Sequence, residues 1–145
     1  MNPWPRQYDV RKVHMGRASE GADLLNMLNE VCREREIRAG AVSLVGAVSC
    51  AVLMYYRQET KRYETLPEIT QGMEIIAGTG NVSLKDGAPF VHLHLLLADE
   101  QGQTVAGHLA EGTIVFACEY TITELDGPAL ERAHDGDTGL YLWRG

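Results

Sequence analysis

Two histidines stand two residues apart in a stretch that is otherwise apolar. The stretch runs Phe90-Val-His-Leu-His-Leu-Leu-Leu-Ala98, and its histidines are His92 and His94. In a β-strand, residues i and i+2 point to the same face, so the two imidazoles would project together with Cα atoms ~7 Å apart. Imidazole nitrogens bind zinc-type metals at ~2.0–2.1 Å, and side chains at this spacing can reach one ion. The pair is therefore a candidate for two metal ligands.

A third histidine, His108, follows the polar interval Asp99-Glu-Gln-Gly-Gln103. This interval fits a three-residue hairpin loop in which Gly102 takes the left-handed position. Asp99 would then pair with Gln103, and the same register places His94 directly opposite His108, with Cβ atoms ~4.5–5.5 Å apart. A two- or four-residue loop would spoil this alignment. With the three-residue loop, three imidazoles converge on one face of a sheet.

Three neutral histidines that leave a fourth coordination position open are typical of a divalent metal site, and zinc is the metal that we expect first. Such a metal activates water or polarises a carbonyl group. Imidazole also suits other transition metals, so the residues do not fix the identity of the ion. The alternative interpretation is structural: two histidines of the core and one of the surface, each hydrogen-bonded to backbone or water.

Glu119 is a carboxylate on a strongly apolar stretch, where acids are rare unless they are paired or bind a metal. It is the candidate catalytic residue of the chain, as general acid or base. It could also serve as a hydrogen-bond partner of a ligand or as a fourth ligand. The alternative is that its face of the strand is exposed to solvent.

Hydrophobic patterning indicates the elements that would position these residues. One helix is expected after Ser19, a plausible N-cap, and should end near Glu36. Its apolar face consists of Leu24, Leu25, Leu28, Val31 and Cys32. Strands are expected at residues 8–15, 39–48, 51–56, 61–66, 73–77, 90–98, 103–109 and 113–125. In the last of these, alternation places Ile114, Phe116, Cys118, Tyr120 and Ile122 on one face.

One helix followed by many short strands predicts an α+β fold, with a mostly antiparallel sheet on which the N-terminal helix packs. We expect a single compact domain over residues 8–125. Residues 1–7 would form a loose N-terminus. Residues 126–145 would form a tail that packs on the domain or on a neighbouring subunit. Nucleotide-binding and serine-hydrolase folds lack support, because GxGxxG, Walker and GxSxG motifs are absent from the sequence.

Composition and charge narrow the functional classes. The net charge of −7 argues against tight, sequence-independent DNA binding, which requires clustered Lys and Arg. The three cysteines, Cys32, Cys50 and Cys118, lie far apart, so they indicate buried free thiols in a reducing compartment. No apolar run approaches the ~20 residues of a membrane span. We therefore expect a cytoplasmic protein that makes no contact with a membrane.

Several segments, in this order, carry a resemblance to a known family. They are residues 21–25 (GADLL), 78–94 (GTGNVSLKDGAPFVHLH), 98–102 (ADEQG), 106–109 (AGHL) and 116–119 (FACE). Together they resemble the PPC domain (plants and prokaryotes conserved), of the prokaryotic single-domain type, over about residues 8–125. In plants this domain accompanies AT-hook segments that bind DNA.

The resemblance implies a homotrimer and a metal site at His92, His94 and His108. The architecture is also similar to that of acetolactate decarboxylase, a zinc enzyme, but only at the level of the fold. An AT-hook enters the minor groove through an Arg-Gly-Arg-Pro core, which this sequence lacks. The expected partners besides its own copies are therefore DNA or DNA-associated proteins, with direct contact to DNA disfavoured by the net charge of −7 and the missing AT-hook.

Two functions follow from these features. The first is a trimeric, metal-carrying binding and regulatory module associated with DNA by resemblance. The second is a metal-dependent lyase or hydrolase that acts on a small oxygen-rich substrate, with Glu119 as acid or base. The sequence leaves open whether the chain is an enzyme.

Overall fold

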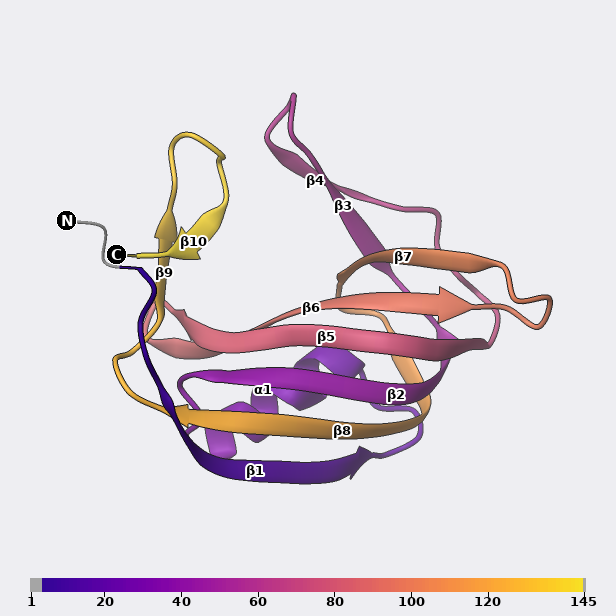
Figure 1. Cartoon of the computed structure of the whole chain (residues 1–145). Helices are drawn as coiled ribbons and strands as arrows, with labels where there is room; N and C mark the ends of the chain where they lie inside the picture. Colours follow the sequence, from indigo (N-terminus) through magenta and orange to yellow (C-terminus); the bar gives the residue numbers. More distant parts are fainter. Residues whose placement is uncertain (1–3, 145) are drawn as a thin grey trace.

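Eight strands follow one another across a single sheet in the order β1-β8-β2-β5-β6-β7-β3-β4, and every neighbouring pair on this path is antiparallel (Figure 1). The structure is a computed structural model that describes residues 4–144. The strands are β1 (Asp9–Ala18), β2 (Gly40–Cys50), β3 (Leu53–Arg57), β4 (Arg62–Thr65), β5 (Met73–Lys85), β6 (Ala88–Ala98), β7 (Thr104–Leu109), β8 (Ile114–Asp126), β9 (Glu131–His134) and β10 (Tyr141–Trp143). Within residues 4–144 the one α-helix is α1 (Leu24–Glu34). The mostly antiparallel sheet with one helix is confirmed, and the sheet dominates more than an α+β label implies.

The helix begins four residues later than the sequence indicated. Asp23, not Ser19, is the N-cap, and its Oδ1 accepts a hydrogen bond from the backbone N–H of Asn26 at 3.0 Å. Its Oδ2 also accepts from the N–H of Gly112 at 2.7 Å, which ties the helix start to the loop before β8. An aspartate that serves both groups is a better cap than a serine outside the first turn. The helix ends at Glu34, and Glu36 has a left-handed φ of 55°.

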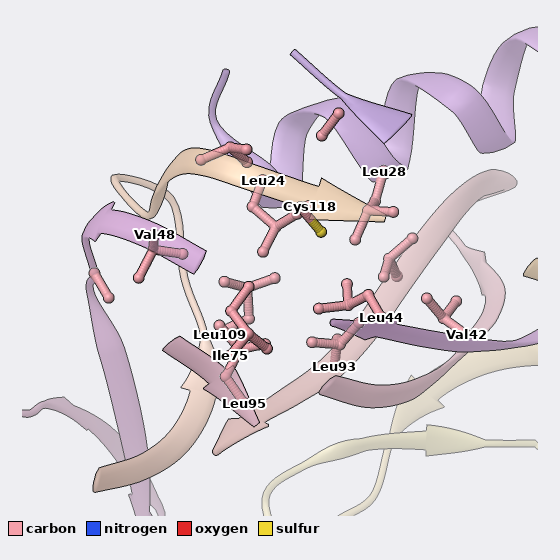
Figure 2. Packing of buried hydrophobic residues seen from close by; sticks show 14 of the residues in the cluster. Leu24, Leu28, Val42, Leu44, Val48, Ile75, Leu93, Leu95, Leu109 and Cys118 are labelled. Atoms are coloured by element: carbon pink, nitrogen blue, oxygen red, sulfur yellow. The ribbon is translucent and has the colours of Figure 1, made fainter. Parts of the chain in front are cut away.

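The hydrophobic core lies between α1 and one face of the sheet. Leu24, Leu28 and Cys32 of the helix are completely buried, as the apolar stripe predicted. Figure 2 shows Leu24 and Leu28 above side chains from the sheet. The labelled sheet residues in that view are Val42, Leu44, Val48, Ile75, Leu93, Leu95, Leu109 and Cys118.

The fifth strand continues beyond residue 77, its predicted end, and runs through Gly78 and Gly80. It covers Met73–Lys85 rather than residues 73–77. A Cβ at Gly80 would lie only 2.0 Å from the carbonyl oxygen of His92. The glycine is therefore needed for close approach of β5 and β6 and does not end the strand.

A β-bulge in β8 reverses the predicted alternation of its first residues. Ala117 pairs with Ala47, but the next pair is Val115 with Val48, so Phe116 is the extra residue. As a result Val115 is fully buried and Phe116 is 60% exposed, the opposite of the alternation expected from the sequence. A one-residue insertion in a strand exchanges the faces of the residues beyond it, which patterning alone does not detect.

The face of the sheet opposite α1 carries the polar positions of the site. On β6, Leu93 and Leu95 point into the core, while His92 and His94 alternate with them and lie on the other face. His94 pairs with Thr79 and His92 pairs with Asn81 on β5. Directly opposed residues share a face of the sheet, so the two histidines project away from the helix.

The segment after β8 returns to the sheet. In β9, Glu131 and Arg132 pair in parallel with Leu84 and Lys85 at the end of β5, and β10 folds back on β9.

Near the N-terminus of the chain, Arg6 donates hydrogen bonds to the carbonyl oxygens of Ala129 and Arg144. The first three residues of the expected loose N-terminus lie outside the described residues. Across residues 4–144, no helix is both long and apolar enough to cross a bilayer.

Candidate metal centre

The hairpin between β6 and β7 has the register predicted from its loop. The N–H of Asp99 donates to the carbonyl of Gln103 at 2.9 Å, and the N–H of Gly102 donates to the carbonyl of Asp99 at 2.9 Å. Gly102 has a left-handed φ of 78°. With this three-residue loop, His94 pairs with His108 across the two strands. The alignment that the loop predicted is confirmed.

The three histidines converge on one point outside the sheet. Nε2 of His92 lies 3.2 Å from Nε2 of His94. The ring centroid of His108 is 5.0 Å from that of His92 and 5.6 Å from that of His94. One potential ligand nitrogen from each ring lies within 4.8 Å of the others. Nitrogens ~2.0–2.1 Å from a shared ion would be spaced in this range, so the trio fits a tetrahedral metal with an open position.

Two of the rings are neutral at physiological pH. Burial lowers the pKa of His92 to about 4, with the nearby His108, Arg132 and His94 adding to the effect. Burial likewise lowers the pKa of His108 to about 4, aided by His94 and Arg132. A metal must compete with protons for imidazole nitrogen. These two imidazoles therefore present a free lone pair to a metal at neutral pH.

One ring nitrogen among the three histidines has no hydrogen-bond partner in the described part of the protein, and a bound group could supply that partner. Within residues 4–144, Nδ1 of His108 is the buried side-chain atom that makes no hydrogen bond. Leaving such an atom unsatisfied costs about 1–3 kcal/mol. A bound ion or ligand at that nitrogen would offset the cost. The donor set, the neutral rings and this unpartnered atom all fit a metal of the zinc type.

The depressed pKa values predict that the metal-free protein loses stability as the pH falls from 6.5 to about 4. In that window the histidines of the unfolded chain bind protons while His92 and His108 in the folded chain remain neutral, so protonation favours unfolding. Above pH 6.5 both states are neutral and the two rings contribute no pH dependence. Thermal melts of metal-free wild type and His92→Gln between pH 7.5 and 4.5 measure the effect. The variant should show a shallower fall in Tm; parallel curves would contradict the prediction.

A cavity of about 330 Å³ opens directly beside the histidines. His92 and His108 line it, together with residues from the β3–β4 and β9–β10 hairpins. Figure 1 shows both hairpins extending beyond the main sheet on the same side. The hydroxyl of Tyr56 donates to the carbonyl of Thr138 at 2.6 Å, which connects the two hairpins. This volume lies at the lower end of the range for small-molecule sites, ~300–1,000 Å³.

Arg132 is a residue of the site that the sequence analysis missed. It lies on β9, is 9% exposed, and lines the cavity beside His92 and His108. It belongs to the segment that was expected only to form a tail. The short apolar run Tyr141-Leu-Trp143 after Gly139 could have indicated a closing hairpin, but no pattern in the sequence connects Arg132 to β5.

The structure does not bring Glu119 to the histidines within one chain. Glu119 is exposed on β8, where it pairs with Arg17 and Val45. Two strands, β2 and β5, lie between β8 and β6. With strands ~4.8 Å apart, the separation is roughly 14 Å. A catalytic role for Glu119 stays a prediction that would require a contact beyond this chain.

The carboxylate that is buried in this sheet is Glu124, five residues further along β8. Its side chain accepts from Nε2 of His14 at 2.8 Å and lies 3.5 Å from the guanidinium of Arg11. His14, which has no partner in the local sequence pattern, thus belongs to a structural polar cluster on β1 and β8. His134 is exposed and makes an edge-to-face contact with the ring of Tyr141.

Comparison with known proteins identifies close structural relatives. The model of the Plants and Prokaryotes Conserved domain family matches residues 6–126. A crystal structure of a metal-containing protein from Archaeoglobus fulgidus is 42% identical, with a TM-score of 0.91 over 96% of this chain and 97% of that one. A plant- and prokaryote-conserved (PPC) protein from Pyrococcus horikoshii is 33% identical, with a TM-score of 0.90 over 96% and 95% of the two chains.

A similar sequence also occurs inside a longer protein. The bifunctional protein GlmU of Synechococcus sp. (strain JA-2-3B'a(2-13)) is 32% identical over 142 residues, which make up 97% of this chain and 21% of that protein. The chain spans about a fifth of the length of the curated relatives it matches. The match therefore concerns one domain of a larger polypeptide.

Proposed function

The chain belongs to the Plants and Prokaryotes Conserved domain family, as its sequence resemblance predicted, and on that premise we propose that it is a trimeric, metal-carrying binding module. Each chain would hold one divalent metal ion, zinc before others, on His92, His94 and His108. The observation that carries the proposal is the convergence of three imidazoles with ligand nitrogens within 4.8 Å of one another. The A. fulgidus relative, which is described as metal-containing, supports it.

The chemistry of the site follows from its ligands. A bound zinc-type ion would supply a Lewis acid with one exchangeable position. The chain's own residues prepare the site: β6 presents His92 and His94 on one face, and the β6–β7 hairpin places His108 opposite His94. Tyr63 packs against His108 with ring centroids 4.9 Å apart. Burial raises the pKa of Tyr63, so its phenol stays protonated and can donate a hydrogen bond into the cavity.

A second function is favoured by the cavity beside the histidines. A lyase or hydrolase acting on a small oxygen-rich molecule needs a metal with an open position next to a pocket of this size. The chain offers the pocket, whereas Glu119 does not reach it within one subunit. We therefore rank the binding module first and the enzyme second.

Zinc titration into metal-stripped protein tests the proposed metal site. With a chromophoric competitor as indicator, we expect one zinc to bind per chain at pH 7.5. Saturation at one equivalent supports the site. Two results would contradict the metal site on which both functions depend. One is a zinc affinity below that of free imidazole, and the other is the binding of several zinc equivalents without a defined end point.

The proposed trimer has a mass in solution of three times the 16.0 kDa of one chain. Its proposed contact surface is the sheet face opposite α1, where Val13, Met15 and Val45 are 57%, 80% and 54% exposed. Register places Met15 and Val13 on the same face as the histidines. Exposed apolar patches of this kind are typical of subunit interfaces.

Light scattering of wild type, Met15→Glu and Tyr55→Glu measures the oligomer. A charge at Met15 should dissociate the trimer, because burying it in an apolar interface is costly. Tyr55, 55% exposed on β3, lies outside the proposed surface and serves as the matched control. A wild-type mass of one chain would contradict the trimer, and unchanged assembly of Met15→Glu would contradict the surface.

We propose that any association with DNA runs through partner proteins. The net charge of −7 opposes direct contact with phosphate. In a gel-shift experiment at physiological salt, micromolar protein should leave a random duplex unshifted. A shift that disappears with added salt would show direct binding and contradict this part of the proposal.

A further inference from the structure

Arg132 is a buried cation without an anionic partner. It is 9% exposed, and its guanidinium donates to the hydroxyl of Ser83 at 2.7 Å, the side-chain oxygen of Asn81 at 2.8 Å and the carbonyl of Tyr141 at 2.9 Å. All three acceptors are neutral. Among the ion pairs within residues 4–144, none includes Arg132. Its Cζ also lies 5.4 Å from the ring centroid of Phe90 and 5.8 Å from that of Trp143, so aromatic faces stabilise part of the charge. Buried charges are normally paired with an opposite charge, so a guanidinium without an anion requires an explanation.

The guanidinium also retains donors for a ligand. It carries five N–H groups, of which the three hydrogen bonds use three. Two N–H groups remain, the number that a carboxylate accepts in a bidentate pair. Arg132 lines the cavity together with His92 and His108, so a ligand that it holds within this cavity lies beside the candidate metal centre.

The cavity wall carries further positive charge besides that of Arg132. Lys61 and Lys85 line the cavity with Arg132, and no acidic residue of the described chain is among the lining residues. In the whole sequence, 20 acidic residues outnumber 13 Lys and Arg. Three cations around one small cavity therefore run against the charge of the protein, and they favour a negatively charged ligand.

The remaining wall is aromatic. Phe90 and Tyr141 both line the cavity and lie under the ammonium group of Lys85, with ring centroids 5.4 Å and 4.1 Å from Nζ. Tyr56 and Tyr63 also line the cavity. Aromatic walls next to a cation suit a ligand with a compact apolar or planar body and an anionic head.

The hydrogen-bond donors favour a carboxylate over a phosphate. Phosphate sites usually provide several free backbone N–H groups. In the loop that lines this cavity, the N–H of Gly139 already donates to the carbonyl of Asp135, and the N–H of Leu140 donates to the hydroxyl of Thr138. The loop therefore offers no cradle of free N–H groups at these positions, and Arg132 is left as the main directional donor.

We propose that this cavity binds a small organic carboxylate, with its carboxylate on the free N–H groups of Arg132 and its body between the aromatic walls, facing His92 and His108. The contact with Arg132 does not need a metal. The role of the carboxylate as a ligand or substrate beside the metal rests on the proposed function. The inference thus adds a ligand class to the site.

Calorimetric titration with benzoate tests the proposal, with benzamide as the uncharged analogue of the same shape and phenyl phosphate as the phosphate analogue. Metal-stripped wild type should bind benzoate at least 10-fold more tightly than benzamide or phenyl phosphate. Equal binding of benzoate and benzamide, or no binding of either, would overturn the carboxylate site. Tighter binding of phenyl phosphate would overturn the choice of carboxylate.

Variants assign the effect to Arg132. Arg132→Gln should reduce benzoate affinity at least 10-fold and abolish the preference over benzamide, while Arg132→Lys should restore part of that preference. Arg57→Gln is the matched control, because Arg57 is an exposed arginine paired with Glu64 outside the cavity. If Arg132→Gln fails to fold, the comparison of benzoate with benzamide on wild type decides alone. Unchanged affinity in a folded Arg132→Gln overturns the assignment.

The same titrations on zinc-loaded protein separate this inference from the metal proposal. A benzoate preference in stripped protein that binds no zinc would remove the metal site and leave the carboxylate site standing. Zinc binding without a benzoate preference would support the metal site and overturn the carboxylate site.

Discussion

Replacing His94 by alanine should lower the zinc affinity of the protein about 100-fold or more. His94 is exposed and lies with a ring nitrogen 3.2 Å from that of His92, so the change removes one ligand without removing core volume. Loss of an outer-shell partner alone typically costs 10–100-fold in metal affinity, and loss of a direct ligand should cost at least the upper end. Zinc titration against a competing chelator measures the change.

The matched control is His134→Ala. His134 is also an exposed histidine on a strand, but it belongs to β9 and stands outside the group of three. Its replacement should leave zinc affinity within about 2-fold of wild type, since no ligand is lost. Equal losses in both variants would indicate non-specific binding by surface histidines and would contradict the assignment of the site.

Gly80→Ala should destabilise the protein by about 3 kcal/mol or more, because the new methyl group meets backbone rather than a flexible side chain. Its Cβ would stand 2.0 Å from the carbonyl oxygen of His92 and 2.7 Å from the Cα of Leu93. For a chain of this size the corresponding fall in Tm is roughly 6–12 °C. Because β6 must move at His92, zinc affinity should fall as well.

Gly136→Ala controls for the general effect of replacing glycine. A Cβ at Gly136 meets no atom within 4 Å. Its Tm should therefore stay within about 3 °C of wild type, as expected for a surface change of less than ~1 kcal/mol. Thermal unfolding of both variants in the metal-free state makes the comparison. A Gly80→Ala variant as stable as Gly136→Ala would contradict the close approach of β5 to β6.

Local patterns predicted the central part of the site. The loop between β6 and β7 is short, and Gly102 can take the left-handed conformation that a three-residue loop requires, so the length of the loop determined the pairing of His94 with His108. The alternation of β6 then placed His92 on the same face. Both conclusions required only residues within one hairpin, where the sequence constrains geometry strongly.

Long-range features escaped prediction for a physical reason. Arg132 reaches the histidines because β9 pairs in parallel with the end of β5, a contact across almost 50 residues that no local periodicity encodes. The face of Phe116 depends on a bulge against β2, which is likewise invisible in the sequence of β8. Glu119 was selected because its surroundings in sequence are apolar, but strand order separates it from the histidines.

The two glycines of β5 show how one residue type supports opposite interpretations. Gly78 and Gly80 lie just beyond the predicted end of this strand at residue 77, and instead of following a strand end they allow neighbouring strands to approach. At Gly78 a Cβ would meet the side chain of Leu44 at 2.5 Å, and at Gly80 it would meet the backbone of β6. Glycine in a strand indicates either a turn or a close contact, and only the pairing of the strands distinguishes them.

X-ray absorption at the zinc edge of the zinc-loaded protein tests the central claim most directly. Three histidine ligands predict a first shell of three nitrogens at ~2.0–2.1 Å, with an oxygen donor in the fourth position and imidazole scattering beyond. A sulfur shell at ~2.3 Å, which would require Cys32, Cys50 or Cys118 as a ligand, would contradict the site. So would a shell made only of oxygen atoms, as for a hydrated surface ion.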